Sequence, residues 1–499
     1  MSLEEEFATL SLHLELQSAV PLYLQLANQL KKLIKDDRLH EDQRLPSSRK
    51  LSQLLSISRT SSINAYDQLI AEGYLVARPS SGVFVSGLHA MKQKNVKYSS
   101  AQTAPIAKPI KVAEAAEPSF AFDSGPDVAL FPFDEWARCS SRVWRKQNID
   151  ILRAFPAGGY EPLKQAVTNY LKVLRNLDCQ PEQVIITAGS RDALTLIATA
   201  ALFAKKAMTQ EQSSAINLRV ALEDPSYSPL QSGFAAHSSD ISYCPIDAQG
   251  ACLPDNEIDI AWLTPTCQYP LGAVMSTERK LDWLALSQQH NSWIVEDDYD
   301  SEYQYQKPPL ATFFALSNNL YSAEQQRVIY TGGFSKVLFR TLRMGYIVVP
   351  LRLISAFHQA QDLLGNVASL PTQTILADFL INRRFYSHLR KTKKIYQQRR
   401  DYLHQLVTTV LSEYYRCELP SSGMHLLLRA TPGNNMPDTV LHQQLAQEGI
   451  IAAALSNYYF VSGQQGLILG YSGATQMQMQ QGIAVMQRCL QQFHTKIAK

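Results

Sequence analysis

The chain has 499 residues, room for roughly three folding units of about 150 residues each, so a single small binding module is excluded. Hydrophobic residues make up 45% of the sequence and charged residues 18%. This composition is typical of a globular protein and excludes a disordered or fibrous one. The formal net charge is +3 at pH 7, and the excess of Lys and Arg lies between residues 21 and 119. The positive charge therefore gathers towards the amino end.

No segment of the sequence predicts a membrane span or export. The longest nearly apolar stretch, from Leu194 to Ala204, is 11 residues long, which is too short to cross a bilayer. Glu4, Glu5 and Glu6 stand where a secretory signal would carry positive charge. The seven cysteines form no C-x-x-C pair, so neither a disulfide framework nor a zinc site is indicated. We therefore expect a cytoplasmic, soluble protein with reduced thiols and no bound metal.

Residues 88–119 separate two differently patterned parts of the chain. They mix Ala, Pro, Lys and Ser without helical or strand periodicity, which predicts an extended linker. The sequence thus predicts a multi-domain protein, with a first domain at 14–87 and a second at 120–495.

The second domain alternates short β-branched runs with amphipathic ones, which indicates an α/β domain with a mostly parallel sheet covered by helices. The predicted strands are 184–187, 219–223, 258–264, 293–297, 328–331 and 345–349. Residues 353–412 are mainly helical in pattern, with a break at Pro371. Strands at 424–428 and 467–471 and a final helix predict a smaller α+β subdomain.

The first domain has the pattern of three short helices and a hairpin. Apolar residues recur at helical spacing after Pro21, a second helix fits 48–55, and a third runs from Arg59 to Gly73, a residue that favours helix ends. We expect the third helix to bury Ile63, Tyr66, Leu69 and Ile70. Two small strands are predicted in YLVARPSSGVFV. These elements indicate a winged helix-turn-helix, with a small helical bundle as the alternative.

PLYLQLANQLKKLI and RLPSSRKLSQLLSISRTSSINAYDQLIAEGYLVARPSSGVFV resemble the GntR-type DNA-binding domain, which implies double-stranded operator DNA as a partner. The predicted DNA-contacting residues are Arg49, Arg59, Thr60, Ser61, Ser62 and Gly82. A guanidinium can grip a phosphate or pair with a guanine edge. The three hydroxyl residues lie at the expected exposed start of the third helix, and the wing-tip glycine would let the backbone enter the minor groove. Ile63 replaces a second arginine found in many GntR proteins, so the operator sequence stays open.

Polar clusters in the second domain have more than one meaning when taken singly. EDDYDSE at 296–302 could be a divalent metal site or a solvated turn, and Lys336 in GGFSK could be an ordinary surface lysine. Their order along the chain, however, resembles the fold-type I aminotransferase domain, in the version fused to a GntR domain that defines the MocR-type regulators. The matching segments are FDSGPDVALFPFDEW, PEQVIITAGSRDAL, VALEDPSY, TPTCQYPLG, WIVEDDYDSEYQY, VIYTGGFSKVLFRTLRMGYIV and SSGMHLLLR.

This resemblance implies pyridoxal 5′-phosphate (PLP) as cofactor. Lys336 would form the internal aldimine, which needs an amine near a desolvated aldehyde carbon. Asp297 would keep the pyridine nitrogen protonated and so preserve the electron sink. Tyr299, two residues further along the strand, would donate to the phenolic oxygen of the ring, and Tyr227 would stack on the ring face.

The phosphate group of the cofactor is expected at the helix that starts after Gly189, because free N–H groups and the helix dipole favour an anion there. The residues assigned to this cradle are Gly189, Ser190, Arg191, Ser335 and Arg343. For Arg343 the alternative is an ion pair with a carboxylate at the sheet edge.

Three departures from the family pattern cluster on the ligand side of the cofactor. Ile468 stands where an active aminotransferase holds the substrate α-carboxylate with arginine, and the loss of such a contact costs about 1.5 to 3 kcal/mol per hydrogen bond. Ser228 and Pro229 follow the EDP-x-Y tyrosine, where some relatives that sense amino acids carry another arginine. Cys267 replaces a histidine that is common in the TP-x-x-Q segment. PLP binding is therefore expected, whereas transamination is not implied.

Three functions remain open at this point. The first is a transcriptional regulator that binds DNA and senses PLP, or a small amine or amino-acid effector, through the Lys336 aldimine. The second is a working PLP-dependent aminotransferase with an accessory DNA-binding domain. The third is a dimerisation scaffold without cofactor. The resemblance also implies a homodimer.

Overall fold

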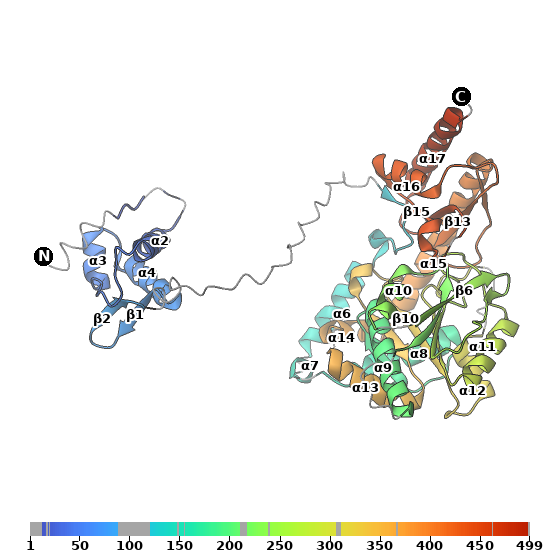
Figure 1. The fold of residues 1–499 in the computed structure, drawn as a ribbon, viewed down its shortest axis with the longest axis horizontal. Helices are drawn as coiled ribbons and strands as arrows, with labels where there is room; N and C mark the ends of the chain where they lie inside the picture. The colour runs from blue at the N-terminus through green and yellow to red at the C-terminus, as the bar shows by residue number, and fades with distance from the viewer. Residues whose placement is uncertain are drawn as a thin grey trace. The chain divides into compact units, whose positions relative to one another are not determined.

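The computed structural model describes residues 12–15, 18, 20–87, 120–146, 149–153, 155–209, 217–237, 240–305, 311–365, 368–461 and 463–497. The described residues fall into two units, one within residues 1–112 and one within 113–499 (Figure 1). The predicted linker at 88–119 lies outside the described residues.

The first unit is a three-helix domain with a hairpin. Its elements are α2 (Leu22–Lys35), α3 (Ser48–Leu54), α4 (Arg59–Ala71), β1 (Leu75–Arg78) and β2 (Gly82–Val85), and the two strands pair antiparallel. Ser47 and Ser58 precede α3 and α4, and each accepts a backbone N–H with its side chain, the usual way to satisfy an orphan donor at a helix start. The winged helix-turn-helix predicted from the sequence is confirmed.

Helix α4 buries a different stripe from the one predicted. Ser62, Ala65, Tyr66 and Leu69 are the buried residues of this helix, whereas Ile63 keeps 37% of its surface exposed. Positions 62, 65, 66 and 69 are three or four residues apart and so share one face. Ile63 lies about a hundred degrees away from Ser62 around the helix axis, and its predicted burial is wrong.

The second unit contains, among its described residues, an eight-stranded sheet in the order β4-β11-β10-β9-β8-β5-β6-β7. The strands are β4 (Val184–Thr187), β5 (Arg219–Asp224), β6 (Asp240–Asp247), β7 (Gly250–Ala251), β8 (Ile260–Leu263), β9 (Trp293–Asp297), β10 (Val328–Gly333) and β11 (Gly345–Val348). The central strands run parallel, while β11 is antiparallel to both of its neighbours. The sheet is therefore mixed, and all six predicted strands are present.

Helices cover both faces of this sheet. Alternate residues of its strands point to opposite sides, and since both sets are apolar, both faces need to be covered. On one side Ile185, Val295 and Ile347 share a core with α9 (Ser190–Thr209) and α13 (Ile354–Leu364), which lie side by side in Figure 1. On the other side Ile186 and Ile294 join the larger core. The helices of that side are α8 (Glu161–Arg175), α11 (Thr277–Gln289) and α12 (Phe313–Leu320).

A smaller subdomain follows in the chain. Its sheet has the order β12-β13-β16-β15, with β12 (Tyr415–Cys417), β13 (His425–Ala430), β15 (Ala453–Ala454) and β16 (Gly466–Gly470). The remaining α-helices are α6 (Phe133–Arg145), α7 (Asp150–Arg153), α10 (Ser228–Ala235), α14 (Leu370–Ile381), α15 (Arg384–Val410), α16 (Asp438–Gln447) and α17 (Gln476–Ile497). The short strand β3 (Phe120–Ala121) pairs parallel with β14 (Ile450–Ile451), so the beginning of the second unit is bound to the smaller subdomain.

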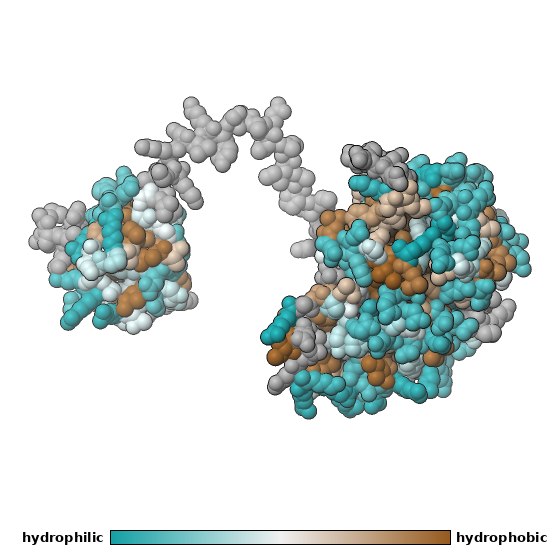
Figure 2. Space-filling model, turned by 90° about the horizontal axis from the view of Figure 1, so that it is seen from below, coloured by the Kyte–Doolittle hydropathy of each residue, from teal (hydrophilic) through white to brown (hydrophobic). Residues whose placement is uncertain are grey.

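The surface of the second unit is mainly hydrophilic with separate apolar areas (Figure 2). Several large apolar side chains are exposed on α6, on α7 and directly before α7, namely Phe133, Trp144, Leu152 and Ile149. No helix formed by the described residues is long and apolar enough to span a bilayer.

Candidate functional site

The residues predicted to contact DNA lie mostly on the exposed surface of the first unit. Arg49 on α3 and Arg59 and Thr60 at the start of α4 are exposed. Ser61 is half-buried, and its hydroxyl lies 2.8 Å from that of the capping residue Ser58. The two arginine side chains are thus available to an anionic partner.

Gly82 starts the second strand of the wing with φ +114°, a region that favours glycine. A Cβ at this position would lie 3.2 Å from the Arg44 side chain. Arg44 is exposed and adds positive charge to the wing. We did not predict this residue, because its proximity to Gly82 depends on how the chain before α3 bridges to Phe84 of β2.

Ser62 is fully buried. Its predicted place on the DNA-contacting surface is therefore wrong. Its hydroxyl has no hydrogen-bond partner among the described residues. The side chain faces the domain core with Ala65 and Tyr66 rather than solvent.

In the second unit the strand register brings the predicted cofactor residues to one edge of the sheet. Asp297 at the end of β9 pairs with Thr331 of β10, and Gly333 at the end of β10 pairs with Gly345 of β11. Gly345 in turn pairs with Thr187 at the end of β4. The loops that follow β4, β9 and β10 therefore leave the same edge, which is where ligands bind in open α/β sheets.

Lys336 lies in the turn after β10 and keeps 28% of its side chain exposed. Its Nζ donates to the carbonyl of Ser124 at 3.1 Å and lies 3.3 Å from the hydroxyl of the same residue. It also lies 3.9 Å from Oδ1 of Asp300 and 5.7 Å from the centre of the Tyr299 ring. The structure therefore places this lysine inside a polar and aromatic site instead of on an ordinary surface.

Asp297 is held by an indole. Trp262 Nε1 donates to its Oδ2 at 3.0 Å. Burial raises the pKa of Asp297 to about 7, while the Trp262 hydrogen bond and the charge of Lys336 oppose that rise. A carboxyl group poised near neutrality is well suited to share a proton with a ring nitrogen.

The two predicted tyrosines differ in placement. Strand β9 ends at Asp297, so strand alternation does not extend to Tyr299, whose hydroxyl donates to the Cys267 carbonyl at 2.8 Å. Tyr227 caps α10 and is 37% exposed. It lies close enough to Tyr269 to influence that phenol electrostatically. Their contacts with a cofactor ring stay predictions.

The expected phosphate cradle assembles around the start of α9. Gly189 has φ +89°, and a Cβ there would stand 3.4 Å from Cζ of Arg343, so glycine allows the guanidinium to approach the helix start. Ser190 and Arg191 are exposed in the first turn. The Ser335 hydroxyl is buried without a hydrogen-bond partner among the described residues. A buried donor that lacks an acceptor fits an anion, since leaving it unpaired costs about 1 to 3 kcal/mol.

Arg343 makes no ion pair with another described residue, so the alternative of a sheet-edge ion pair is not seen. The charge of Arg343 acts on Asp192, whose carboxylate accepts the Ala188 N–H at 2.7 Å; burial raises the pKa of Asp192, and Arg343 opposes that rise. Arg343 is exposed and stands ready for an external anion.

The carboxylates of EDDYDSE have separate partners. Glu296 accepts the backbone N–H groups of Phe313 and Phe314, Asp298 forms an ion pair with Arg175 at 2.7 Å, and Glu302 accepts from Tyr170. Asp297 and Asp300 face Trp262 and Lys336. Within the described ranges no cluster of His, Cys, Asp and Glu has the arrangement of a metal site.

Ile468, at the position of the missing arginine, is 4% exposed and lies on β16 between Leu427 and Ala453 of the neighbouring strands. Leu467 and Leu469 belong to the main core, while Ile468 points to the other face of the strand. No arginine side chain is therefore supplied at this point of β16.

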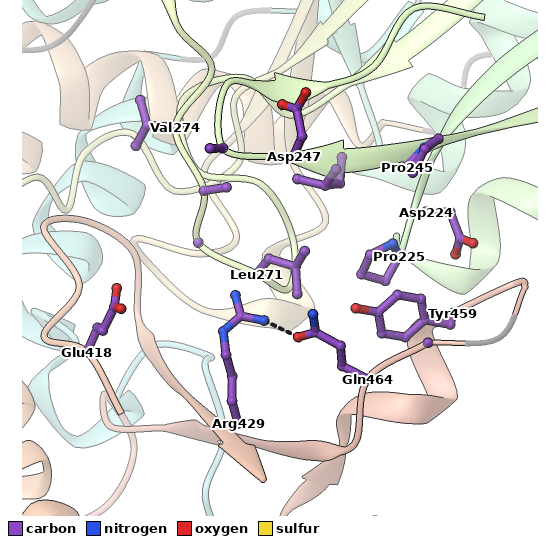
Figure 3. Close-up of a pocket in the computed structure, with 15 residues that line it drawn as sticks. Asp224, Pro225, Pro245, Asp247, Leu271, Val274, Glu418, Arg429, Tyr459 and Gln464 are labelled. Carbon is purple, nitrogen blue, oxygen red and sulfur yellow. Dashed lines mark hydrogen bonds between the residues drawn. The ribbon is translucent and has the colours of Figure 1, made fainter. Parts of the chain in front are cut away.

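A cavity of about 790 Å³ lies beside the EDPSY motif. It is lined by Asp224 at the end of β5 and the following Pro225, by the end of β6, and by Arg429 and Gln464 of the smaller subdomain. Figure 3 shows the Arg429 guanidinium donating to Gln464, with Tyr459 next to Pro225. Lys336 and Asp297 do not line this cavity, so it is distinct from the site described above.

Sequence reasoning missed four residues of the Lys336 site. Ser124, Trp262, Asp300 and His425 all contact or influence its main groups. Ser124, Asp300 and His425 lay within segments that we had matched to the family, but none of them was assigned a role, and Trp262 lay outside those segments. His425 donates from Nε2 to the Pro270 carbonyl at 2.9 Å, and burial lowers its pKa to about 4.

Comparisons with known proteins agree with this architecture. Residues 22–85 match the bacterial regulatory proteins of the gntR family, and residues 127–484 match aminotransferase class I and II. The chain is 33% identical over 484 residues to the probable rhizopine catabolism regulatory protein MocR of Rhizobium meliloti, covering 94% of each chain.

It is 26% identical over 455 residues to the HTH-type pyridoxine biosynthesis transcriptional regulator PdxR of Corynebacterium glutamicum, covering 90% of this chain and 91% of the other. Among solved structures, the α-aminoadipate aminotransferase LysN of Thermus thermophilus has a TM-score of 0.65 at 22% identity. That match covers 75% of this chain and 92% of LysN. At this identity the likeness shows the fold alone.

A winged helix-turn-helix and an aminotransferase-fold domain in one chain define a class of DNA-binding proteins with an enzyme-like second domain. Within that class, the chain belongs to the MocR-type subfamily of GntR transcriptional regulators.

Proposed function

We propose that this protein binds operator DNA through its first unit and PLP through its second, and that occupancy of the PLP site by a small amine alters DNA binding. The proposal is supported mainly by one observation. Lys336, Asp297 and the Gly189–Arg343 cradle occur at one edge of the sheet, in a chain that also presents Arg49 and Arg59 on a winged helix.

The residues at the sheet edge fit the three chemical parts of PLP. Arg343, Ser335 and the start of α9 would bind the phosphate, Asp297 would hold a proton against the ring nitrogen, and Lys336 would supply the primary amine. When bound, PLP supplies an aldehyde that a primary amine can attack, and a ring that withdraws electrons. LysN, which shares the fold, was solved with N-(5′-phosphopyridoxyl)-L-leucine.

The ligand side of the site favours sensing over turnover. Ile468 and Ser228 offer no positive charge to a substrate carboxylate, so an ordinary α-amino acid would lose a bidentate contact there. The effector we propose is therefore PLP itself or an amine held without such a contact. Steady-state turnover of amino acids at the usual enzyme rate of about 10 per second would contradict this assignment.

Ser124 offers a physical route from the site towards the DNA-binding unit. It lies four residues after Phe120, where β3 joins β14 of the smaller subdomain, and its carbonyl and hydroxyl hold the Lys336 amine. A change at Lys336 would break these contacts and release the segment that directly follows residues 88–119. Such a ligand-dependent change can shift the balance between two states only if the ligand binds them unequally.

The exposed apolar side chains of α6 and α7 support a homodimer. Phe133 and Leu152 are each 66% exposed and Trp144 is 51% exposed, although such residues are usually buried in a monomer. We propose that a second copy covers this face. Phe133→Ser with Leu152→Ser should yield a monomer in sedimentation, and an unchanged oligomeric state would refute this assignment.

The DNA half is tested by titrating the purified chain with its own promoter DNA at several salt concentrations. Affinity should fall as salt rises, because bound counterions are released from phosphates. Arg59→Ala should weaken the complex and reduce this salt dependence, whereas Arg390→Ala, on the exposed face of α15, should not. If Arg59→Ala bound as tightly as the wild type, the proposed DNA contact would be wrong.

A further inference from the structure

Asp300 is a buried carboxylate that the proposed binding of PLP leaves unexplained. It is 1% exposed, and neither of its oxygens has a hydrogen-bond partner among the described residues. Its Oδ1 lies 3.9 Å from Nζ of Lys336. A buried carboxylate without hydrogen bonds is costly unless a charge or a proton compensates it.

The other carboxyl groups near Asp300 are differently placed. They belong to Asp297, Asp298 and Glu302. Each of them accepts a hydrogen bond from an aromatic side chain, namely Trp262, Tyr330 and Tyr170 respectively. Asp300 alone among these four faces the Lys336 ammonium as its nearest compensating group.

The remaining titratable groups around Asp300 and Lys336 are uncharged at pH 7. They are Cys267, His425 and the phenols of Tyr269, Tyr299, Tyr305 and Tyr471. Burial raises the pKa of the thiol to about 11, raises those of the phenols, and lowers that of His425 to about 4. None of these neighbours carries a positive charge, so Lys336 is the group that can compensate the charge of Asp300.

We propose that Asp300 is a positioning residue that pairs with the Lys336 ammonium in the cofactor-free protein and accepts its proton when PLP is captured. This inference rests on the proposed function and adds a proton acceptor to the same site. In the step, one proton passes from Nζ to the Asp300 carboxylate. The lone pair so freed attacks the aldehyde carbon of PLP, and the aldehyde oxygen leaves as water with the two remaining protons of Nζ.

Such a pair has a specific pH signature. Between their two macroscopic pKa values, a coupled lysine and carboxylate together hold a constant number of protons. The reactive form, in which the amine and the carboxylic acid are both neutral, therefore has the same population at every pH between those two values. Without Asp300 the proton must leave to solvent, and the fraction of neutral amine then rises about tenfold per pH unit until Lys336 is deprotonated.

The experiment measures the rate of PLP capture by the cofactor-free full-length protein from pH 6 to pH 9 by stopped-flow absorbance. The ratio of variant to wild-type rate is taken at each pH, because it cancels the titration of PLP. For Asp300→Asn we expect this ratio to rise about tenfold per pH unit over part of the range. Asp300→Glu, which restores the carboxylate, should give a flat ratio, as should Asp282→Asn on the exposed face of α11.

A merely structural role for Asp300 would lower all rates by one factor and leave the ratio flat, which would overturn the inference. A steep ratio for Asp300→Glu would overturn it as well. If Asp300→Asn does not fold, Asp300→Ser, which needs less volume, replaces it in the same measurement. If the wild type captures no PLP, the proposed function itself fails. If it captures PLP with a flat Asp300→Asn ratio, only the role of Asp300 fails.

Discussion

The phosphate cradle makes a quantitative prediction about Arg343. Its guanidinium lies against Gly189 at the start of α9, has no carboxylate partner among the described residues, and is the group expected to bind the phosphate of PLP. A hydrogen bond to a charged group contributes about 1.5 to 3 kcal/mol. Since 1.4 kcal/mol is a factor of ten in affinity, Arg343→Gln should weaken PLP binding by roughly 10-fold to 150-fold.

Pyridoxal, which lacks the phosphate, provides the internal comparison. Absorbance titrations of the cofactor-free protein with PLP and with pyridoxal should show that Arg343→Gln loses affinity for PLP but not for pyridoxal. Arg390→Gln makes the same chemical change on the exposed face of α15 and should alter neither affinity. Equal losses for both ligands would mean that the substitution disturbs the fold and not a phosphate contact. An unchanged affinity for PLP would refute the cradle directly.

Three further predictions follow from buried groups. Because Ser62 is buried, Ser62→Ala should leave operator affinity within about twofold, as a mobility-shift titration can measure; a larger loss would return Ser62 to the DNA surface. Burial raises the pKa values of Glu296 and Glu302 to about 7, so the folded second unit binds more protons than the unfolded chain between about pH 5 and 7. Its stability, followed in urea by tryptophan fluorescence, should fall as pH rises through that window, and a rise would contradict these shifts. Trp262→Phe removes the hydrogen bond to Asp297 and should weaken PLP binding about 3-fold to 10-fold in a cofactor titration. Trp283→Phe, which removes the hydrogen bond from Nε1 to the Ala251 carbonyl, is the control that should leave PLP affinity unchanged.

Most strands of the second unit were predictable because a change from apolar to polar residues marks where each of them begins and ends. The predicted limits of β4 and β9 coincide with the observed ones, since each is a short buried apolar run bounded by polar residues or glycine. Strand β6 was missed because DISYCPID is largely half-buried and lacks a continuous apolar run. The antiparallel placement of β11 was also beyond the sequence, because strand direction depends on connections and not on local pattern.

Site residues that belong to a family motif with a known role could be predicted from the sequence. Site residues that are brought together only by tertiary contacts could not. Ser62 could have been assigned to the core from its spacing to Ala65, Tyr66 and Leu69, since the helical stripe that holds those three residues includes it. The contact of Asp300 with Lys336 could not, because the chain bends after Asp297 and strand alternation no longer tells which way a side chain points. Ser124 is 212 residues from Lys336 in the sequence, and only folding brings the two together.

We propose that Lys336 is the amine that captures PLP, and every role assigned to its neighbours depends on this. The most direct test of this proposal is borohydride reduction of the PLP-loaded protein followed by peptide mapping. We expect one stable adduct, on the peptide that contains Lys336, and no adduct in Lys336→Ala. Labelling of a different lysine, or a protein that remains colourless and unlabelled with excess PLP, would contradict it.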